Sequence, residues 1–462
     1  MRRLLAGLGA AALAAAAVGA HAAPGPEVAV SVLPGAQNEP SIAIDPRDGQ
    51  VLLAGSNSFR EGTIRIYGSS DGGSSWETAT AYPAPGSLEE TCAADPWVGV
   101  DRLGRQYFSF LRFTPCRGGR PRVFVVTRAN VAASWTEPRA VSPLAGARFD
   151  DKPSLAVDTS PVSPFVNRVY VAWVRATSAL RLSIRISHSD DGGRTWSPPA
   201  TVSRMGTEVT YPSIAVSAEG HVYVAWDNVT SYRLQIARST AGGATFEPER
   251  PVAQFSLVPI PHCGSGVVIR AVRGTCVHAN PIVVVDRSRG PFRGRVYVSY
   301  AQTGIAGSAG VFVKAFDSRL REVPFSADLN GIAVSPTKGA LPERRRPDQF
   351  WPHSAVDAAT GALWVCFYDT WRDRTFRSAY YSCAVSRTGG RTFSRLVKAA
   401  TVASDETVPE ADAQEYGDYE GLAVAGGVAH PIWTDSRDLP FLAEEIYTTR
   451  LRQADVVGAT AR

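Results

Sequence analysis

The feature that most constrains this chain is an opening phrase that returns at intervals of about fifty residues. In most copies a polar or aromatic residue is followed by a proline and a short β-branched run. The copies read NEPSIAID at 38–45, ADPWVGVD at 94–101, DKPSLAVD at 151–158, TYPSIAVS at 210–217, ANPIVVVD at 279–286, FWPHSAVD at 350–357 and, more loosely, GDYEGLAV at 417–424. Such a repeat indicates an array of similar small units that bury their faces against one another.

Each unit has the pattern of four short strands. A second strand follows every opening phrase, for example VYVAWV at 169–174 and VYVAWD at 222–227. In most units a third strand, a glycine-rich turn and a short fourth strand follow. Proline at the beginning of the innermost strand is compatible with a sheet, because strand beginnings and edges tolerate it. Seven such units predict an all-β fold, a seven-bladed β-propeller of four-stranded antiparallel blades.

The seventh unit has no fourth strand of its own. It ends at EIYTTRL, 445–451, whereas EVAVSVL at 27–33 precedes the first unit. We therefore predict that 27–33 pairs as the outer strand of the last blade, because this pairing covers an edge that would otherwise be exposed.

The first 22 residues have the pattern of a secretory signal peptide. Arg2 and Arg3 precede an apolar run that ends in an Ala-His-Ala cleavage site. We expect cleavage and a secreted or periplasmic protein without a later membrane span, an uncleaved anchor being the alternative. The expected organisation is a signal peptide at 1–22, a single propeller domain at 23–455 and a C-terminal tail at 456–462.

Charge and cysteine content narrow the choice of partners. Removal of the two signal arginines lowers the formal net charge from +5 to +3. No basic run interleaved with aromatic residues indicates a nucleic-acid partner. Six cysteines in an exported chain suggest disulfides, and local pairing predicts 92–116, 263–276 and 366–383. The spacing of the cysteines does not fit a zinc site, so we expect no metal or cofactor. We also expect the protein to be a monomer.

Two glycine-rich turns share one spacing, SSDGGSSW at 69–76 and SDDGGRTW at 189–196, with weaker copies STAGGATF at 239–246 and SRTGGRTF at 386–393. The pattern resembles the Asp box, S-x-D-x-G-x-T-W, of the bacterial neuraminidase repeat (BNR) and sialidase-like propellers. The matching residues are Ser69, Asp71, Gly73 and Trp76 in the first turn and Ser189, Asp191, Gly193 and Trp196 in the second.

We interpret these turns as structural. The aspartate accepts hydrogen bonds from backbone N–H groups of its own turn, the glycines allow positive φ, and the aromatic ring packs between neighbouring sheets. A calcium or sugar site at each turn is the alternative. The weaker copies lack the aspartate but keep the aromatic residue, which favours the structural role.

The candidate binding groups lie on the face of the propeller opposite the glycine-rich turns. The residue at the proline-preceding position of each copy should ring the mouth of the channel, and we expect an extended backbone there. Carboxylates, arginines and aromatic rings at one mouth suit an anionic or sugar ligand, although mutual pairing of Asp and Arg is the alternative. The ligand-binding candidates are Trp351, Tyr211, Asp151, Lys152, Asp418 and Asp435.

The resemblance also implies catalytic roles. Sialidases of this kind clamp the sugar carboxylate with three arginines, use a tyrosine supported by a glutamate as nucleophile, and use an aspartate as acid and base. The candidates in this chain are Arg372 and Arg437 for the clamp, Tyr416 or Tyr419 with Glu415 or Glu420 for the nucleophile, and Asp95 or Glu39 for the acid.

This chain departs from the family in two ways. The family's N-terminal Arg-Ile-Pro motif is absent, and the nearest string, TIRIYG at 63–68, falls on a predicted third strand. The family's catalytic propeller has six blades, which is the alternative for the fold. Two functions therefore stay open. One is a secreted glycoside hydrolase of the exo-α-sialidase type that cleaves terminal sialic-acid-like sugars. The other is a non-catalytic BNR-repeat propeller that binds glycan or protein at the channel mouth.

Overall fold

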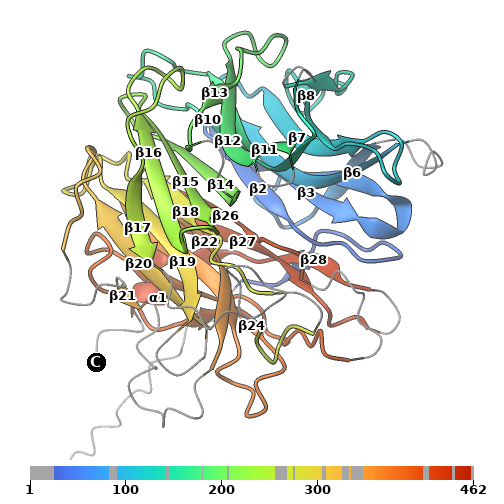
Figure 1. Ribbon diagram of the computed structural model, residues 1–462. Coiled ribbons are helices and arrows are strands. Elements are labelled where there is room, and N and C mark those ends of the chain that lie inside the picture. The colour runs from blue at the N-terminus through green and yellow to red at the C-terminus, as the bar shows by residue number, and fades with distance from the viewer. Residues whose placement is uncertain are drawn as a thin grey trace, which may run out of the picture.

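The protein is described by a computed structural model, which covers residues 25–82, 91–141, 146–178, 181–204, 208–254, 268–273, 276–303, 309–324, 332–333, 347–408, 416–439 and 443–458. Its strands form seven antiparallel sheets (Figure 1). The prediction of a seven-bladed propeller is therefore confirmed, and the six-bladed alternative is wrong.

In blades 1 to 6 the four strands form a meander in which consecutive strands are neighbours, whereas in blade 7 the last strand pairs with the second. Blades 1 to 3 comprise β2 (Ser41–Asp45), β3 (Asp48–Ser58), β4 (Thr63–Ser69) and β5 (Glu77–Tyr82); β6 (Cys92–Val100), β7 (Gln106–Phe113), β8 (Arg122–Arg128) and β9 (Arg139–Ala140); and β10 (Phe149–Val157), β11 (Val169–Ser178), β12 (Arg181–Ser189) and β13 (Ala200–Thr201). A 3-10 turn, η1 (Phe59–Glu61), connects β3 to β4.

The remaining blades follow the same order. Blades 4 to 6 comprise β14 (Val209–Val216), β15 (Val222–Asn228), β16 (Arg233–Ser239) and β17 (Arg250–Gln254); β18 (Ile282–Val285), β19 (Val296–Thr303), β20 (Ala309–Phe316) and β21 (Ile332–Ala333); and β22 (Gln349–Val356), β23 (Leu363–Asp369), β24 (Tyr380–Ser386) and β25 (Val397–Lys398). Blade 7 contains β26 (Gly421–Ala425), β27 (Val428–Asp435), β28 (Glu445–Thr448) and β29 (Leu451–Arg452), and helix α1 (Gln453–Gly458) follows it.

The first strands of the blades surround the axis. Each contacts the first strand of the next blade, and β26 contacts β2, which closes the ring (Figure 1). The N-terminal segment completes blade 7, because β1 (Val28–Ala29) pairs antiparallel with β28 and aligns Val28 with Thr448. The predicted closure by the N-terminal strand is confirmed. No helix within the described ranges has the length and apolar character that a bilayer crossing needs.

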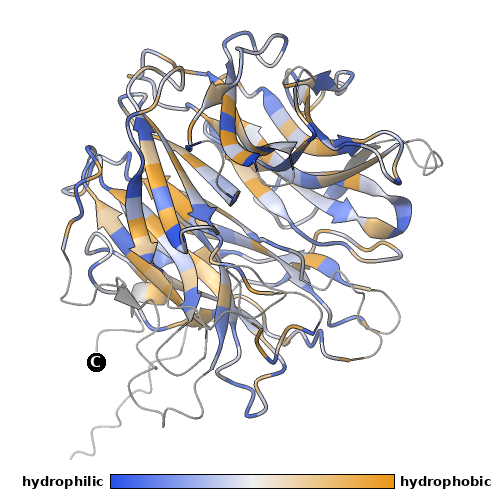
Figure 2. Cartoon of the chain, viewed as in Figure 1, coloured by the Kyte–Doolittle hydropathy of each residue, from blue (hydrophilic) through white to orange (hydrophobic). Residues whose placement is uncertain are grey.

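The hydrophobic core lies between neighbouring blades. Buried apolar residues form clusters that draw on two adjacent sheets, for example Ile64 of blade 1 with Phe108 of blade 2. Hydrophobic residues are spread over the strands of the blades and alternate with hydrophilic ones (Figure 2). The tryptophans of the second strands are fully buried, which explains their recurrence in the repeat. They are Trp173, Trp226, Trp364 and Trp433.

The glycine-rich turns have the hydrogen bonds that we predicted. The Asp191 Oδ1 atom accepts the backbone N–H groups of Arg194, at 3.0 Å, and of Thr195, at 2.9 Å. The backbone N–H of Gly193 donates to Ser189 Oγ at 2.8 Å. The corresponding bond from glycine N–H to serine Oγ is 3.0 Å long in both copies that lack the aspartate. The serine and glycine thus maintain the turn without the carboxylate.

The aromatic residue of each turn packs where two blades meet. Trp76 of blade 1 lies against the cluster shared with blade 7, and Trp196 of blade 3 lies against the cluster shared with blade 2. Phe246 and Phe393 pack in the same way against the preceding blade. The predicted packing between sheets is confirmed at all four turns, including the two without aspartate.

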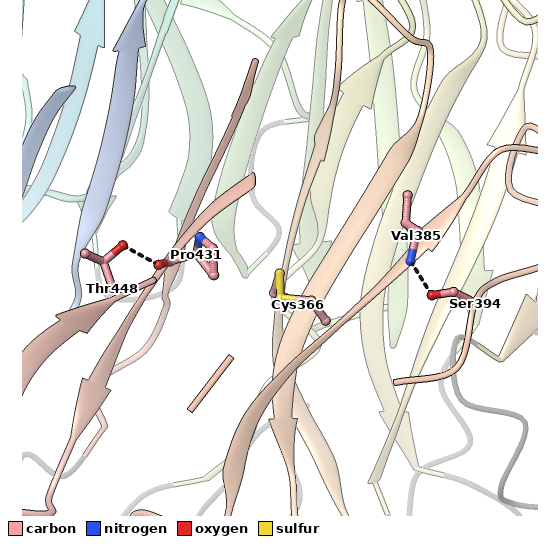
Figure 3. Close-up of a disulfide and its surroundings, with 6 residues drawn as sticks. Cys366, Val385, Ser394, Pro431 and Thr448 are labelled. Atoms are coloured by element: carbon pink, nitrogen blue, oxygen red, sulfur yellow. Dashed lines mark hydrogen bonds between the residues drawn. A yellow bond between two sulfur atoms is a disulfide. The ribbon is translucent and has the colours of Figure 1, made fainter. Parts of the chain in front are cut away.

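Two of the three predicted disulfides are confirmed, Cys92–Cys116 and Cys366–Cys383. The second joins directly opposed residues of β23 and β24 in blade 6. Figure 3 shows this disulfide between two hydrogen bonds, from Thr448 Oγ1 to the carbonyl of Pro431 at 2.7 Å and from Val385 N–H to Ser394 Oγ at 3.1 Å. Cys276 is also disulfide-bonded, and Cys263, its predicted partner, lies outside the described residues.

Candidate functional site

The residues that precede proline on the first strands have a strained backbone. We predicted an extended conformation there, and this prediction is wrong because every one of these six residues has positive φ. The angles are 53° at Glu39, 59° at Asp95, 47° at Lys152, 52° at Tyr211, 42° at Asn280 and 45° at Trp351. Left-handed backbone is costly for residues other than glycine and is concentrated at functional sites.

In four of the blades a bulge in the first strand accounts for the positive φ. The pairing of β10 with β11 shifts register between Asp151 and Ser154, and blades 2, 4 and 6 shift at the equivalent place. A bulge leaves one residue without a ladder partner, and the following proline has no N–H to lose. The strand therefore bends at this point, at the same level in each of these blades.

Asp418 of blade 7 joins this ring to residues of three other blades. Its carboxylate accepts a hydrogen bond from Lys152 Nζ of blade 3. Its carbonyl oxygen accepts one from Asn280 Nδ2 of blade 5 at 2.9 Å, and its backbone N–H donates to Glu39 Oε1 of blade 1 at 3.0 Å. Contacts from one residue to blades 1, 3 and 5 require these groups to converge at the axis.

We call Glu39, Asp95, Asp151, Lys152 and Asp418 the axial cluster. Glu39 and Asp95 are connected by a hydrogen bond between their carboxyl groups and by a neighbouring amide. Asn57 Nδ2 donates to Glu39 Oε2 at 2.8 Å, and the backbone N–H of Asp95 donates to Asn57 Oδ1 at 3.0 Å. Lys152 is the only lysine or arginine among the described residues with an ion pair to these carboxylates.

The carboxyl groups of the axial cluster titrate at different pH values. Burial, with the neighbouring charges of Asp151 and Asp418, raises the pKa of Asp95 to about 7 against the opposing effect of Lys152. Burial and the charge of Asp95 raise the pKa of Glu39 well above its usual value. Burial would also raise the pKa of Asp418, but the charge and hydrogen bond of Lys152 outweigh it and lower that pKa. The cluster thus combines two carboxyl groups of raised pKa, Glu39 and Asp95, with one of lowered pKa, Asp418.

Aromatic rings border the axial cluster. The Tyr211 hydroxyl donates to the Asp418 carboxylate, and Lys152 Nζ lies 4.9 Å from the centre of the Tyr211 ring. The Tyr419 hydroxyl donates to the Pro96 carbonyl at 3.2 Å, and its ring lies 5.4 Å from that of Trp97. Trp97 is only partly buried, so its ring offers an aromatic surface at this end of the channel.

A second group of predicted residues lies in the core instead. Trp351 is 1% exposed and packs against Phe350, Tyr368 and Tyr416. The two oxygens of Glu420 accept the Tyr368 hydroxyl at 2.6 Å and the Thr434 N–H at 3.0 Å. The hydroxyl of Tyr416 donates to the Ser404 carbonyl at 3.2 Å.

The predicted arginines lie away from the cluster. The Arg437 guanidinium binds Asp435 through Nε at 2.9 Å and Nη2 at 2.6 Å, and binds Glu27 through Nη1. Its charge therefore connects the N-terminal segment to blade 7. Arg372 is exposed and lies 5.8 Å from the ring centre of Tyr380. The structure does not bring these two arginines together, and Glu415 lies outside the described residues.

Several residues near the site were not singled out from the sequence. Trp97 follows the third letter of its opening phrase, where reading past the proline would have found it. Asn57 is the last residue but one of the second strand β3, close to where the later blades have the chosen Asp and Arg groups. Asp150 carries a buried ion pair with Arg175 at 2.8 Å and a longer one with Arg122 at 3.6 Å. No sequence signal distinguished this pairing from a surface one.

Comparison with known proteins gives fold similarity only. No family model matches the chain, and no curated protein matches it. It is similar to a protein of unknown function from Dyadobacter fermentans, at 13% identity over 92% of this chain and 97% of the other, with a TM-score of 0.49. It is similar to an intramolecular trans-sialidase from leech, at 12% identity over 79% and 68%, with a TM-score of 0.49. An α-L-arabinanase from Penicillium chrysogenum matches at 10% identity over 93% and 99%, with a TM-score of 0.48.

Proposed function

We propose that the protein is a glycoside hydrolase that acts at the axial cluster. The observation that carries this proposal is the divergence of pKa between Asp95, raised to about 7, and Asp418, lowered by Lys152, within one hydrogen-bonded network. Carboxyl groups whose environments separate their pKa values are the usual acid and base of glycoside hydrolysis.

Asp95 is the proposed general acid. Its pKa of about 7 keeps a large fraction protonated near neutral pH, which is the condition under which an acid both holds and donates its proton. In the proposed step this proton passes to the glycosidic oxygen as the bond to the anomeric carbon breaks. Glu39, hydrogen-bonded to Asp95, positions the acid.

Asp418 is the proposed base. Its ionised carboxylate takes a proton from the water that attacks the anomeric carbon, so that water supplies both the hydroxyl of one product and the proton that restores the acid. Lys152 keeps this carboxylate ionised through their direct hydrogen bond. The Asp418 side chain is partly exposed to solvent, whereas Glu39 is buried.

The proposed substrate is a neutral sugar. Carboxylates outnumber cations in the axial cluster, and its single described lysine already binds Asp418. Of the two arginines predicted to clamp a sialic-acid carboxylate, Arg437 is engaged by Asp435 and Glu27, and Arg372 is exposed beside the Tyr380 ring. Trp97, which is partly buried, supplies an aromatic surface, on which a sugar ring packs through its apolar face, and the buried Tyr419 ring lies 5.4 Å from it.

We also infer that the protein works outside the cytoplasm. Cys92–Cys116 and Cys366–Cys383 are disulfides, and structural disulfides persist in oxidising compartments. The predicted signal peptide at 1–22 agrees with export, although it lies outside the described residues.

The test is hydrolysis of a panel of p-nitrophenyl glycosides and sialosides. We expect turnover of a neutral glycoside, with kcat lowered about 100-fold or more in Asp95→Asn and in Asp418→Asn. Asp190→Asn, an exposed aspartate on the opposite face, is the matched control and should retain activity. The rate should fall as pH rises through about 7, where Asp95 loses its proton.

Each other outcome has a defined meaning. Sialoside turnover with no neutral-glycoside turnover would contradict the substrate class. Sugar binding without turnover, weakened by Asp418→Asn, would favour the non-catalytic propeller. Absence of both binding and turnover across the panel would refute the proposal.

A further inference from the structure

A cavity lies at the end of the channel opposite the axial cluster. It has a volume of about 590 Å³ and is lined by residues from all seven blades. Lys152 of the axial cluster and Val157 of this cavity lie on the same strand, β10, five residues apart. At the rise of an extended chain this places the cavity about 16 Å along the axis from the cluster. It is a separate site from the axial cluster, and ligand binding there does not require the proposed hydrolase activity.

The cavity has one apolar side and one basic side. The first strands of blades 1 to 3 contribute apolar groups, among them Ile44, Val98 and Leu155. Turns between first and second strands contribute the basic groups, which are Arg102, Arg287, Arg289 and Arg293. A cavity of this size and mixed lining is typical of a site for a small organic molecule.

The arginines are not neutralised by the carboxylates around them. Arg293 alone has an ion pair with a described carboxylate, to Glu219 at 2.9 Å. The hydrogen bond of Arg287 goes to the hydroxyl of Thr159, at 2.7 Å. Burial lowers the pKa of Arg287, with only the more distant charge of Asp158 opposing this effect.

The acidic residues near this cavity accept hydrogen bonds from turns at the same end of the channel, in their own blade or in the next. Asp158 accepts hydrogen bonds from the backbone N–H of Ser160 and the hydroxyl of Ser163. Asp357 lines the cavity and accepts the N–H groups of Ala359 at 2.9 Å and Gly427 at 2.6 Å. The lining contains four arginines and one carboxylate, that of Asp357, so positive charge is in excess there.

We propose that this cavity binds a small organic anion, whose phosphate, sulfate or carboxylate group pairs with Arg287 and Arg102 while its apolar part lies on the blade 1 to 3 side. A guanidinium binds such oxyanions through two parallel hydrogen bonds. Because an organic anion also buries apolar surface on this side, we expect it to bind more tightly than an inorganic ion alone.

The test is isothermal titration calorimetry of the full mature chain with phenyl phosphate, inorganic phosphate and benzyl alcohol. We expect binding in the order phenyl phosphate, then inorganic phosphate, with no detectable binding of benzyl alcohol. Arg287→Gln should weaken phenyl phosphate binding about tenfold to a hundredfold, as expected for the loss of charged hydrogen bonds.

Two further variants keep the test decisive. Arg102→Gln changes an exposed residue, so it should fold normally and weaken binding even if Arg287→Gln does not fold. Arg139→Gln, on the exposed outer strand β9 of blade 2, is the matched control and should bind as the parent protein does. No binding of phenyl phosphate by the parent, or equal binding by Arg102→Gln and Arg139→Gln, would overturn the proposal.

Discussion

The ring closure predicts a contrast between two neighbouring valines. Val30 is 4% exposed and packs between blades 7 and 1 against Ala54, Tyr67 and Ile446. Val32, two residues later, is 67% exposed. The two side chains are identical and lie in the same segment, so replacing each by alanine separates the contribution of the closure from that of the residue type.

The expected magnitude follows from burial. Val30→Ala removes two buried carbon groups, worth about 0.8 kcal/mol each, and leaves a cavity that adds to the loss. We expect the free energy of unfolding to fall by about 2–3 kcal/mol. Val32→Ala removes groups that are already in water and should change it by less than about 0.5 kcal/mol.

The assay is equilibrium unfolding in urea, monitored by tryptophan fluorescence and fitted with one common m-value, the dependence of the unfolding free energy on urea concentration, for all variants. Deletion of residues 23–36 removes the whole segment and should lower the melting temperature sharply, because the edge of β28 loses its partner strand. Equal stabilities of Val30→Ala and Val32→Ala, or an unchanged melting temperature on deletion, would refute the closure as a source of stability.

Three more predictions concern stability. The pKa of Asp95 is raised to about 7, so its contribution to stability is complete below the pKa of the unfolded state and is lost as pH rises through about 7. In urea unfolding between about pH 4 and pH 8, the stability of Asp95→Asn relative to the parent should therefore increase with pH. A difference that stays constant with pH would contradict this. Hydrogen bonds within its turn lower the pKa of Asp191 to about 2, although burial opposes them. Asp191→Ala should therefore lower the free energy of unfolding by about 1–3 kcal/mol at neutral pH, and this loss should shrink as pH falls through about 4 towards 2. A loss of stability that persists in acid would exclude the carboxylate as its source. Replacing Cys366 and Cys383 by alanine opens a loop with a sequence separation of 17 residues and should lower stability by about 3 kcal/mol, which thermal unfolding with and without reductant would measure.

The number of blades and the ring closure were predictable from the sequence because both depend on local patterns. Repeated strand phrases determine how many sheets form, and a missing fourth strand at one terminus leaves a place for a strand from the other. The turns were equally predictable, since the hydrogen bonds of Asp191 and Ser189 join residues within four positions of one another.

The composition of the axial ring was predictable, but its conformation was not. A proline as the third letter of the first six phrases identified six ring members, among them Glu39 and Asp95. The preference of pre-proline residues for extended backbone gave the wrong conformation, because a bulge in the first strand outweighs that local preference. The pairing of the whole strand thus determines the backbone conformation at these positions, and the steric preference of a residue before proline does not.

The tertiary structure alone decided which candidate groups meet. Lys152 binds Asp418, which is 266 positions away, and Arg437 binds Glu27, which is 410 positions away. Trp351 is enclosed by aromatic rings although it belongs to the same repeat position as Asp95. Partner choice and burial depend on how the blades close around the axis, and no local pattern in the chain contains that information.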